Sequence, residues 1–308
     1  MAHIEVVSLP NRVSAIATAC SLVLTTFNAA QAQAGEFADA GLSHPLTLAP
    51  ADATSSGGGA EVDDEKAKAA ALAKATLNPI ASLISLPLQN NFDWGGGPND
   101  DGFQYKLNVQ PVIPISLNTN WNVISRTIVP YVYQENYIGT SSQSGLADAV
   151  QSLFFSPVKP TKNGWIWGAG PVLQLPAATD DLLGEEKWGA GPTAVILKQQ
   201  GHWTYGALVN HVWSFAGESD RADVNRTFLQ PFVSYTTKTF TSLGLNAEST
   251  YDWEREQWTV PVNAFVQQLL KLGKQPISLQ LGGRYYAEGP SGAPEWGLRF
   301  QVSFLFPK

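Results

Sequence analysis

The segment at residues 296–306 restricts the possible folds of this chain more than any other feature. Side chains in a β-strand point alternately to two faces. One face of this segment is apolar along its whole length, with Trp296, Leu298, Phe300, Val302, Phe304 and Phe306. The other face carries Gly297, Arg299, Gln301, Ser303 and Leu305. Hydrocarbon offers a side chain no hydrogen-bond partner, so this alternation predicts a strand with lipid on one side and a wet lumen on the other.

The composition argues against a soluble protein, a helical membrane protein and a nucleic-acid-binding protein. Only 15% of the 308 residues are charged, against about a quarter in average proteins, and 10 are Trp. The mean hydropathy of -0.09 is too low for a protein built of membrane-spanning helices. A barrel fits better, because its inward polar residues offset its outward apolar ones. The net charge of -7 does not suit nucleic acid, which requires basic surfaces.

The first 34 residues have the pattern of a cleaved secretory signal peptide. Arg12 precedes an apolar run at 13–27, and small residues at 30–34 offer a cleavage site. The run is too short for a transmembrane helix. Cys20, the only cysteine, lies inside this segment, and its context also allows a lipoprotein site as an alternative. Cleavage at 30–34 predicts a mature chain without disulfides.

The next 51 positions predict a tail that leads into the main domain. Residues 35–60 are rich in Ala, Gly, Ser and Pro, which predicts a disordered, flexible tether. Residues 61–85 predict a short periplasmic helix, ended by Asn78 and Pro79, and a lead-in to the first strand. The apolar residues at its end could plug a lumen, rest on a membrane surface, or simply connect to the strand: Ile80, Leu83, Ile84 and Leu86.

Residues 86–308 alternate between apolar and polar positions in about twelve segments separated by turn-rich breaks. The segments are 86–94, 104–116, 121–134, 146–156, 165–176, 188–198, 203–215, 226–236, 242–252, 258–267, 276–287 and 296–306. The pattern predicts an all-β fold, a single antiparallel up-and-down transmembrane β-barrel of about twelve strands. Seven prolines inside the segments are unusual for strands. They are Pro111, Pro114, Pro130, Pro171, Pro192, Pro231 and Pro261.

Two further patterns favour closure into a membrane barrel. Eight Trp lie at segment ends, as in the interfacial girdles of membrane barrels: Trp94, Trp121, Trp165, Trp188, Trp203, Trp253, Trp258 and Trp296. The breaks also sort by charge, because alternate breaks hold acidic residues while the others are shorter or carry lysines such as Lys159, Lys162 and Lys274. We therefore expect the acidic breaks on the extracellular side and the basic ones on the periplasmic side.

Residues 76–308 resemble a family of Gram-negative outer-membrane proteins often described as transporters or, misleadingly, as neuromedin U. The matching stretches are NPIASLIS at 78–85, QNNF at 89–92, NVQPVIP at 108–114, RTIVP at 126–130, LFFSP at 153–157, ATDDLLG at 178–184, WSFAGE at 213–218, LGKQP at 272–276, and 298–308. The family is distantly similar to barrels encoded beside phenol meta-cleavage pathways. The resemblance implies an outer-membrane barrel, suggests transport and supplies no catalytic residue.

The end of the chain is similar to the C-terminal signal of bacterial outer-membrane barrels, except that Pro307 and Lys308 follow the last Phe. This resemblance implies contact with the barrel-assembly machinery. The expected partners are therefore that machinery, outer-membrane lipid with lipopolysaccharide, and a small solute of unknown identity. We expect no nucleic-acid partner and no cofactor.

If the apolar positions face outward, the polar positions between them line the lumen. The pore-lining candidates are Lys106, Asn108, Gln110, Arg126, Asn246, Glu248, Asp252, Asn263, Gln280, Arg284, Arg299 and Gln301. Basic residues near both chain ends of the barrel facing acids at 248 and 252 would create a transverse field that orients solutes and sets ion preference. The alternative is that these charges pair and fill a narrow, closed interior.

Catalysis and metal binding are the weaker hypotheses. A hydrolase needs a nucleophile beside a base, and His211 is the plausible base because His44 lies in the tether and His202 in a short turn. The acidic stretch at 180–186 could hold a hard cation, but it lacks the alternating ligands of a calcium loop. We therefore predict a non-enzymatic outer-membrane channel for the passive passage of small solutes, and the resemblance to the phenol-pathway barrels suggests hydrophobic or aromatic ones. A closed structural or surface-interaction barrel is the second hypothesis, and a hydrolase the third.

Overall fold

The computed structural model describes residues 59–138 and 141–307, which form one helix and a 16-stranded sheet. The predicted signal peptide and most of the predicted tether lie outside the described residues. The elements are α2 (Gly59–Ala75), β1 (Ile84–Gly96), β2 (Gly102–Val109), β3 (Val112–Ser116), β4 (Trp121–Ile138), β5 (Ser141–Leu146), β6 (Ala149–Pro157), β7 (Trp165–Leu175), β8 (Lys187–Gln200), β9 (Trp203–Gly217), β10 (Asn225–Thr236), β11 (Thr241–Ala247), β12 (Ser249–Asp252), β13 (Gln257–Thr259), β14 (Pro261–Leu272), β15 (Gln275–Tyr286) and β16 (Trp296–Phe306).

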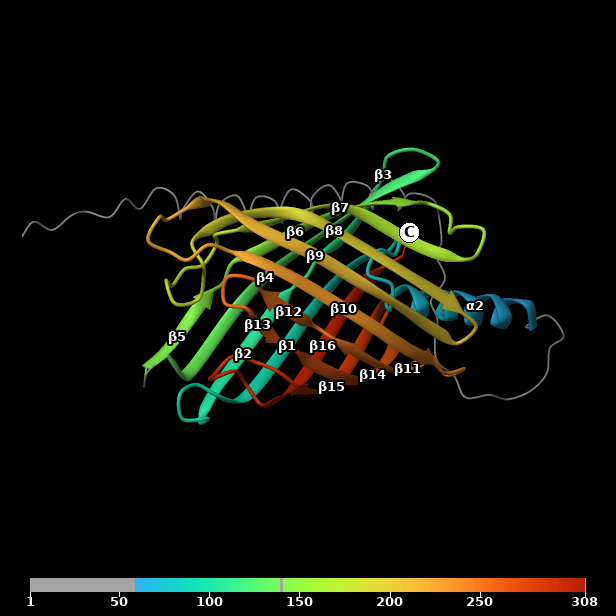
Figure 1. The fold of residues 1–308 in the computed structure, drawn as a ribbon. Helices are drawn as coiled ribbons and strands as arrows, with labels where there is room; N and C mark the ends of the chain where they lie inside the picture. Colours follow the sequence, from blue (N-terminus) through green and yellow to red (C-terminus); the bar gives the residue numbers. More distant parts are fainter. Residues whose placement is uncertain (1–58, 139–140, 308) are drawn as a thin grey trace, which may run out of the picture.

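The sheet closes on itself to form an antiparallel barrel (Figure 1). The first and last strands, β1 and β16, pair from Ile84 opposite Phe306 to Trp94 opposite Trp296. Four pairs of short strands each form one interrupted wall segment, namely β2 with β3, β5 with β6, β11 with β12, and β13 with β14. The wall therefore has 12 strands, which confirms the predicted barrel and strand count.

The interruptions of the wall explain how it accommodates its prolines. Proline lacks the N–H that a sheet ladder requires. The break between β2 and β3 falls at Gln110 and Pro111, and β14 begins at Pro261. Pro171 and Pro192 lie opposite each other inside β7 and β8, and the pairing of these two strands runs on past both residues. The strands continue through these positions instead of ending there.

The two faces of the wall differ as the alternation predicts. On the outside, large apolar side chains are exposed: Leu281 is 57% exposed, Leu245 53% and Phe300 41%. Much of the inner face is polar, and Asn91, Asp93, Asn263 and Arg299 are almost fully buried, while an apolar patch lies at the helix end of the lumen. This inverted arrangement, apolar outside and polar inside, distinguishes the barrel from a soluble domain.

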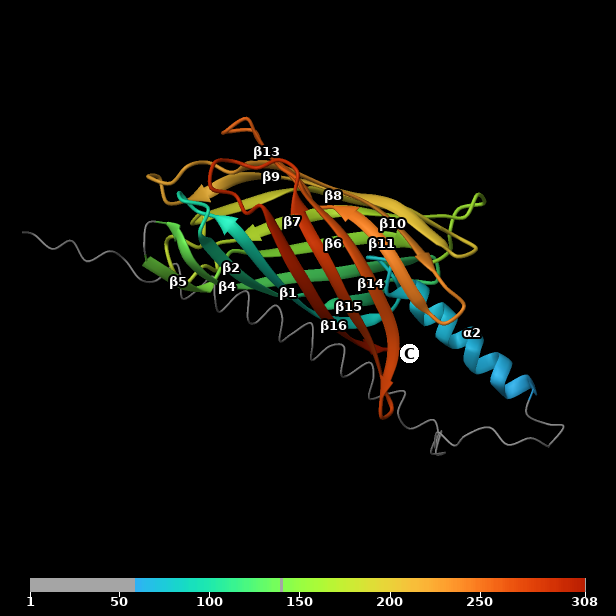
Figure 2. The ribbon, with the colours of Figure 1, turned by 90° about the horizontal axis from the view of Figure 1, so that it is seen from below.

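The barrel has two distinct ends, which we name the helix end, where α2 projects, and the far end (Figures 1 and 2). Turns at the helix end are short, whereas the far end carries longer connections, including residues 176–186 between β7 and β8. Trp94 and Trp296 stack at 4.7 Å at the far end, near Trp253 and Trp258. Trp121, Trp165 and Trp203 begin strands at the helix end. Among the described residues, no helix has both the length and the apolar content to cross a bilayer.

Candidate functional site

The last residues of α2 and the segment that follows, together residues 72–83, enter the helix end of the lumen, and we call them the plug segment. Gln199 Nε2 donates to the Lys74 carbonyl at 2.8 Å, and Gln267 Nε2 donates to Thr76 Oγ1 at 2.7 Å. Farther along, Asn122 Nδ2 donates to Ser82 Oγ at 3.1 Å. Three strands of the wall thus hold the plug segment by side-chain hydrogen bonds.

Ile80 anchors the plug segment by apolar packing. Its side chain is buried in a cluster of inward-facing residues from four strands: Ile124, Phe154, Val195, Leu197 and Leu208. Leu83 also lies in the lumen, where it lines a cavity. Ile84 and Leu86 belong to β1 and lie opposite Phe306 and Phe304 on the apolar outer face. Of the four apolar residues at this point in the sequence, two therefore occupy the lumen and two face outward.

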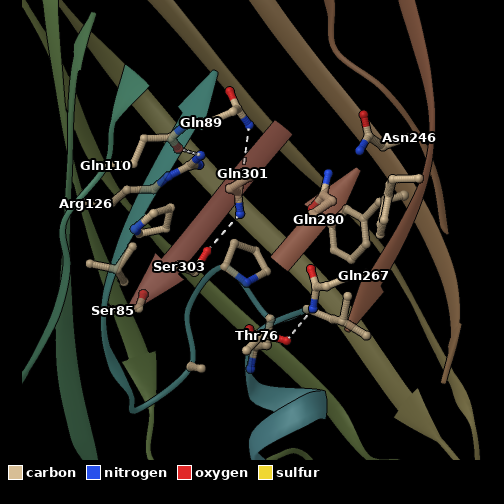
Figure 3. Close-up of a pocket in the computed structure, with 18 of the residues that line it drawn as sticks. Thr76, Ser85, Gln89, Gln110, Arg126, Asn246, Gln267, Gln280, Gln301 and Ser303 are labelled. Atoms are coloured by element: carbon tan, nitrogen blue, oxygen red, sulfur yellow. Dashed lines mark hydrogen bonds between the residues drawn. The ribbon is translucent and has the colours of Figure 1, made fainter. Parts of the chain in front are cut away.

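A cavity of about 340 Å³, the helix-end cavity, lies between the plug segment and the middle of the barrel. Side-chain amides form much of its wall (Figure 3): Gln89, Gln110, Asn246, Gln267, Gln280 and Gln301. The rings of Phe228, Phe232 and Phe265 also line it, together with Arg126 and Arg299. The cavity therefore offers hydrogen-bond donors, apolar surface and positive charge to one small solute.

Four charged residues cross the lumen above this cavity, and we call them the charged belt: Asp93, Glu248, Arg284 and Arg299. Arg299 binds Glu248 through both ends of the guanidinium, Nη1 to Oε1 at 2.7 Å and Nη2 to Oε2 at 2.8 Å. Its Nε donates to Asn91 Oδ1 at 2.7 Å. Arg284 Nη1 lies 3.2 Å from Asp93 Oδ2, and its Nη2 lies 3.9 Å from Glu248 Oε2. Such bidentate, charge-assisted pairs are the strong ones, so the side chains of the belt are held in a fixed arrangement.

Two further cations lie beside the belt without a carboxylate of their own. Arg126 Nη2 donates to Gln110 Oε1 at 3.0 Å, and within the described part of the chain neither Arg126 nor Lys106 has a carboxylate oxygen at 4.0 Å or closer. The middle and helix end of the lumen thus hold four cationic side chains and two carboxylates. This local excess of positive charge contrasts with the net charge of -7 of the whole chain.

A second cavity, of about 460 Å³, lies on the far side of the belt and is partly closed by residues 176–186. Glu185 from this connection accepts from Arg226 Nη2 at 2.5 Å, and Arg226 Nε also binds Asp252 Oδ2 at 3.1 Å. The Glu185 amide donates to Asp148 Oδ2 at 2.8 Å. Arg221 donates to the carbonyls of Asp181 and Gly184. These bonds fold the connection inward over the far mouth of the lumen.

The far rim also carries a charged contact between the first residue of β8 and the connection before β10. Lys187 Nζ lies 3.2 Å from Asp223 Oδ1. Its ammonium, together with a hydrogen bond from the Ser214 hydroxyl, holds the pKa of the Asp223 carboxyl below its usual range. Asp223 therefore stays ionised at neutral pH and keeps the acidic character of this end of the barrel.

The structure brings most of the predicted lumen residues to one region. Those that line the helix-end cavity are Asn108, Gln110, Arg126, Asn246, Glu248, Gln280, Arg299 and Gln301. Lys106 lines the far cavity, and Asn263 is buried, where it donates to Asn246 Oδ1 at 2.7 Å. Arg284 lies in the belt, whereas Asp252 lies at the far rim and pairs with Arg226 and Arg255.

The sequence reasoning missed Asn91, Asp93 and the inward aromatic rings of Phe228 and Phe232. The signal for Asn91 and Asp93 was present, because the odd positions from Ser85 to Asp93 are polar or small without a gap. The two Phe gave no such signal, because they occupy the polar phase of β10 and an apolar residue there looks like a departure from the pattern.

His211 does not have the surroundings of a catalytic base. Its Nδ1 lies 2.7 Å from Thr227 Oγ1, and the same hydroxyl accepts from Trp253 Nε1 at 2.8 Å. In a nucleophile–base pair the second ring nitrogen is held by an orienting group. Here Nε2 of His211 is buried and finds no hydrogen-bond partner among the described residues. The pair resembles an incomplete dyad on the outer face.

The acidic stretch at 180–186 is engaged in local contacts. Asp180 Oδ1 accepts from the Leu182 amide at 2.9 Å, and Glu185 binds Arg226. Within the residues that the structure describes, no group of three or more His, Cys, Asp or Glu side chains is gathered so that it could hold a metal ion. The carboxylates at this site serve to fix the far-end connection.

Comparison with known proteins finds similarity in three-dimensional fold and none in sequence families. No family model matches the sequence, and no curated protein matches it. An outer-membrane channel from Pseudomonas putida F1 superposes with a TM-score of 0.58 over 73% of this chain and 96% of that one, at 14% identity. The chain has the fold of outer-membrane β-barrels. Two other barrels are less similar. The NanC porin has a TM-score of 0.45 and 11% identity over 71% of this chain and 98% of that one. Outer membrane phospholipase A from Escherichia coli has a TM-score of 0.42 and 10% identity over 72% of this chain and 96% of that one.

Proposed function

We propose that the chain resides in the outer membrane of a Gram-negative bacterium, with the far end outside the cell and α2 in the periplasm. The apolar outer face and the Trp at both rims support this placement, because lipid-facing walls require the first and interfaces favour the second. The charge of the connections supports the orientation. Asp180, Glu218 and Glu288 lie at the far end, whereas Lys159, Lys162 and Lys274 lie in helix-end turns.

Membrane residence predicts that lysine costs different amounts of stability at two neighbouring positions of β16. Phe300 is exposed on the outer face, and Gln301 lines the lumen. We expect Phe300→Lys to lower the free energy of unfolding in lipid vesicles by about 2–4 kcal/mol, the cost of a lysine facing hydrocarbon. The matched variant Gln301→Lys should cost markedly less, because its ammonium remains in a polar lumen. Urea titration of the refolded proteins measures both values, and equal losses would contradict the lipid-facing assignment.

We further propose that the barrel is a channel for the passive passage of small solutes. The observation that carries this proposal is a lumen that is not filled: a cavity of about 340 Å³ with a mixed polar and apolar wall and one of about 460 Å³ with a mostly polar wall lie on the two sides of the charged belt. Asn108 lines both cavities, so they adjoin each other along β2. The aromatic rings in the helix-end cavity favour solutes with an apolar or aromatic body.

Liposome swelling tests this channel directly. Vesicles that contain the refolded protein are expected to swell in isotonic arabinose and to remain unchanged in isotonic stachyose, because a narrow lumen excludes the larger sugar. Protein-free vesicles give the baseline. If arabinose fails to enter even when the plug segment has been deleted, the lumen is closed and the channel proposal is wrong.

A closed structural barrel is the alternative, and the charged belt favours it. Arg284 pairs with Asp93 and Arg299 pairs with Glu248, as expected for charges that fill an interior. This reading leaves Arg126 and Lys106 without carboxylates, and it does not account for the two cavities. The swelling experiment separates the two hypotheses.

A further inference from the structure

Among the described residues, Arg126 has no carboxylate partner. Its guanidinium has five N–H donors, and Gln110 Oε1 accepts from one nitrogen at 3.0 Å. The nearest acid in the lumen, Glu248, is already held by both ends of Arg299. In Figure 3, Arg126 points from β4 into the helix-end cavity beside Gln110. Its remaining donors are therefore available to a solute in that cavity.

The rest of the cavity wall suits a neutral, flat body. Phe228 and Phe232 come from β10 and Phe265 from β14, so apolar surface lies on the wall across the barrel from β4. The side-chain amides of Asn246 from β11 and Gln280 from β15 line the same cavity (Figure 3). A volume of about 340 Å³ lies at the lower end of the range for small-molecule sites. One end of the cavity is thus cationic and the other apolar.

We propose that the helix-end cavity is a binding subsite for a small organic monocarboxylate. Its carboxylate pairs with Arg126, and its apolar body lies against Phe228, Phe232 and Phe265. The planar guanidinium fork matches a carboxylate in two parallel hydrogen bonds, and one bound anion reduces the local excess of positive charge. This inference rests on the proposed channel, which provides the route by which the solute enters the cavity. It adds the class of solute that the channel would carry.

Equilibrium binding to the folded full-length protein in detergent tests the subsite without requiring passage. Benzoate is the anionic probe, and benzyl alcohol is its uncharged counterpart of similar shape. We expect isothermal titration to detect benzoate binding, with Arg126→Gln raising its Kd by about tenfold or more. Benzyl alcohol should bind weakly and equally to both proteins. Arg255→Gln, which removes a guanidinium from a far-end turn, is the matched control and should bind benzoate like the parent protein.

The outcomes separate this inference from the channel proposal. Arg126→Lys, which keeps the charge and loses the fork, should lie between the parent and Arg126→Gln, and a heat-dependent gel shift verifies that each variant is folded. Benzoate binding that is absent in the parent, or unchanged in Arg126→Gln, overturns the subsite whether or not the protein conducts. Benzoate binding through Arg126 in a protein that passes no solute supports the subsite and removes the channel.

Discussion

Deletion of residues 35–79 is expected to raise the single-channel conductance of the refolded protein severalfold. The deletion removes α2 and the first part of the plug segment, including Lys74 and Thr76, which receive hydrogen bonds from Gln199 and Gln267. Without them the helix end of the lumen opens to solvent, because the plug segment forms the floor of the helix-end cavity. Conductance in a planar bilayer, at one salt concentration and voltage, measures the change.

A point variant separates displacement of the plug segment from loss of the tail. Ile80→Asp places a carboxylate in the apolar cluster around Phe154 and Leu197, where an unpaired charge is costly. It should raise conductance in the same direction as the deletion. Lys66→Ala, on the exposed face of α2, is the control and should leave conductance unchanged. Equal conductance of all these proteins would show that the plug segment does not obstruct the lumen.

Glu248→Gln is expected to produce the second large effect, a shift of ion preference toward anions together with a loss of stability. The substitution removes the carboxylate that holds both terminal nitrogens of Arg299 and lies near Arg284. The excess of positive charge in the middle of the lumen therefore increases. Breaking a buried ion pair costs about 3–5 kcal/mol, and partial hydration of the lumen places the expected loss near the lower value. Reversal potentials in a salt gradient and urea unfolding measure the two effects.

The matched control for that variant is Glu288→Gln, which removes the same charge from an exposed far-end connection. It should shift the reversal potential much less, because exposed charges are screened by salt. If Glu288→Gln and Glu248→Gln shift the reversal potential equally, the belt does not set ion preference. Arg299→Gln should shift the preference in the opposite direction.

The barrel itself could be predicted from the sequence, because the alternation of apolar and polar residues within each strand indicates which face meets lipid. In β16 six apolar residues occupy one phase, and the structure assigns that phase to the outside. The same local rule gave the twelve wall strands. The prolines do not prevent the barrel: Pro111 falls at a break between β2 and β3, and β7 and β8 continue past Pro171 and Pro192.

The arrangement inside the lumen could be predicted only in part. Alternation identifies Glu248 and Arg299 as inward-facing. It does not show that they bind each other, because their contact depends on how closure of the barrel aligns two residues 51 positions apart in the sequence. The same limit applies to Asp252, which pairs at the rim instead of facing the central cations. Docking of Ile80 depends on an apolar patch contributed by four strands, so no local pattern reveals it.

The current through single refolded full-length molecules in a planar bilayer tests the central claim most directly. Discrete steps that grow after deletion of residues 35–79, with an ion preference that moves toward cations in Arg126→Gln, are the predicted result. A silent bilayer from protein shown to be folded, both with and without the plug segment, would contradict the claim that this barrel encloses a conducting lumen.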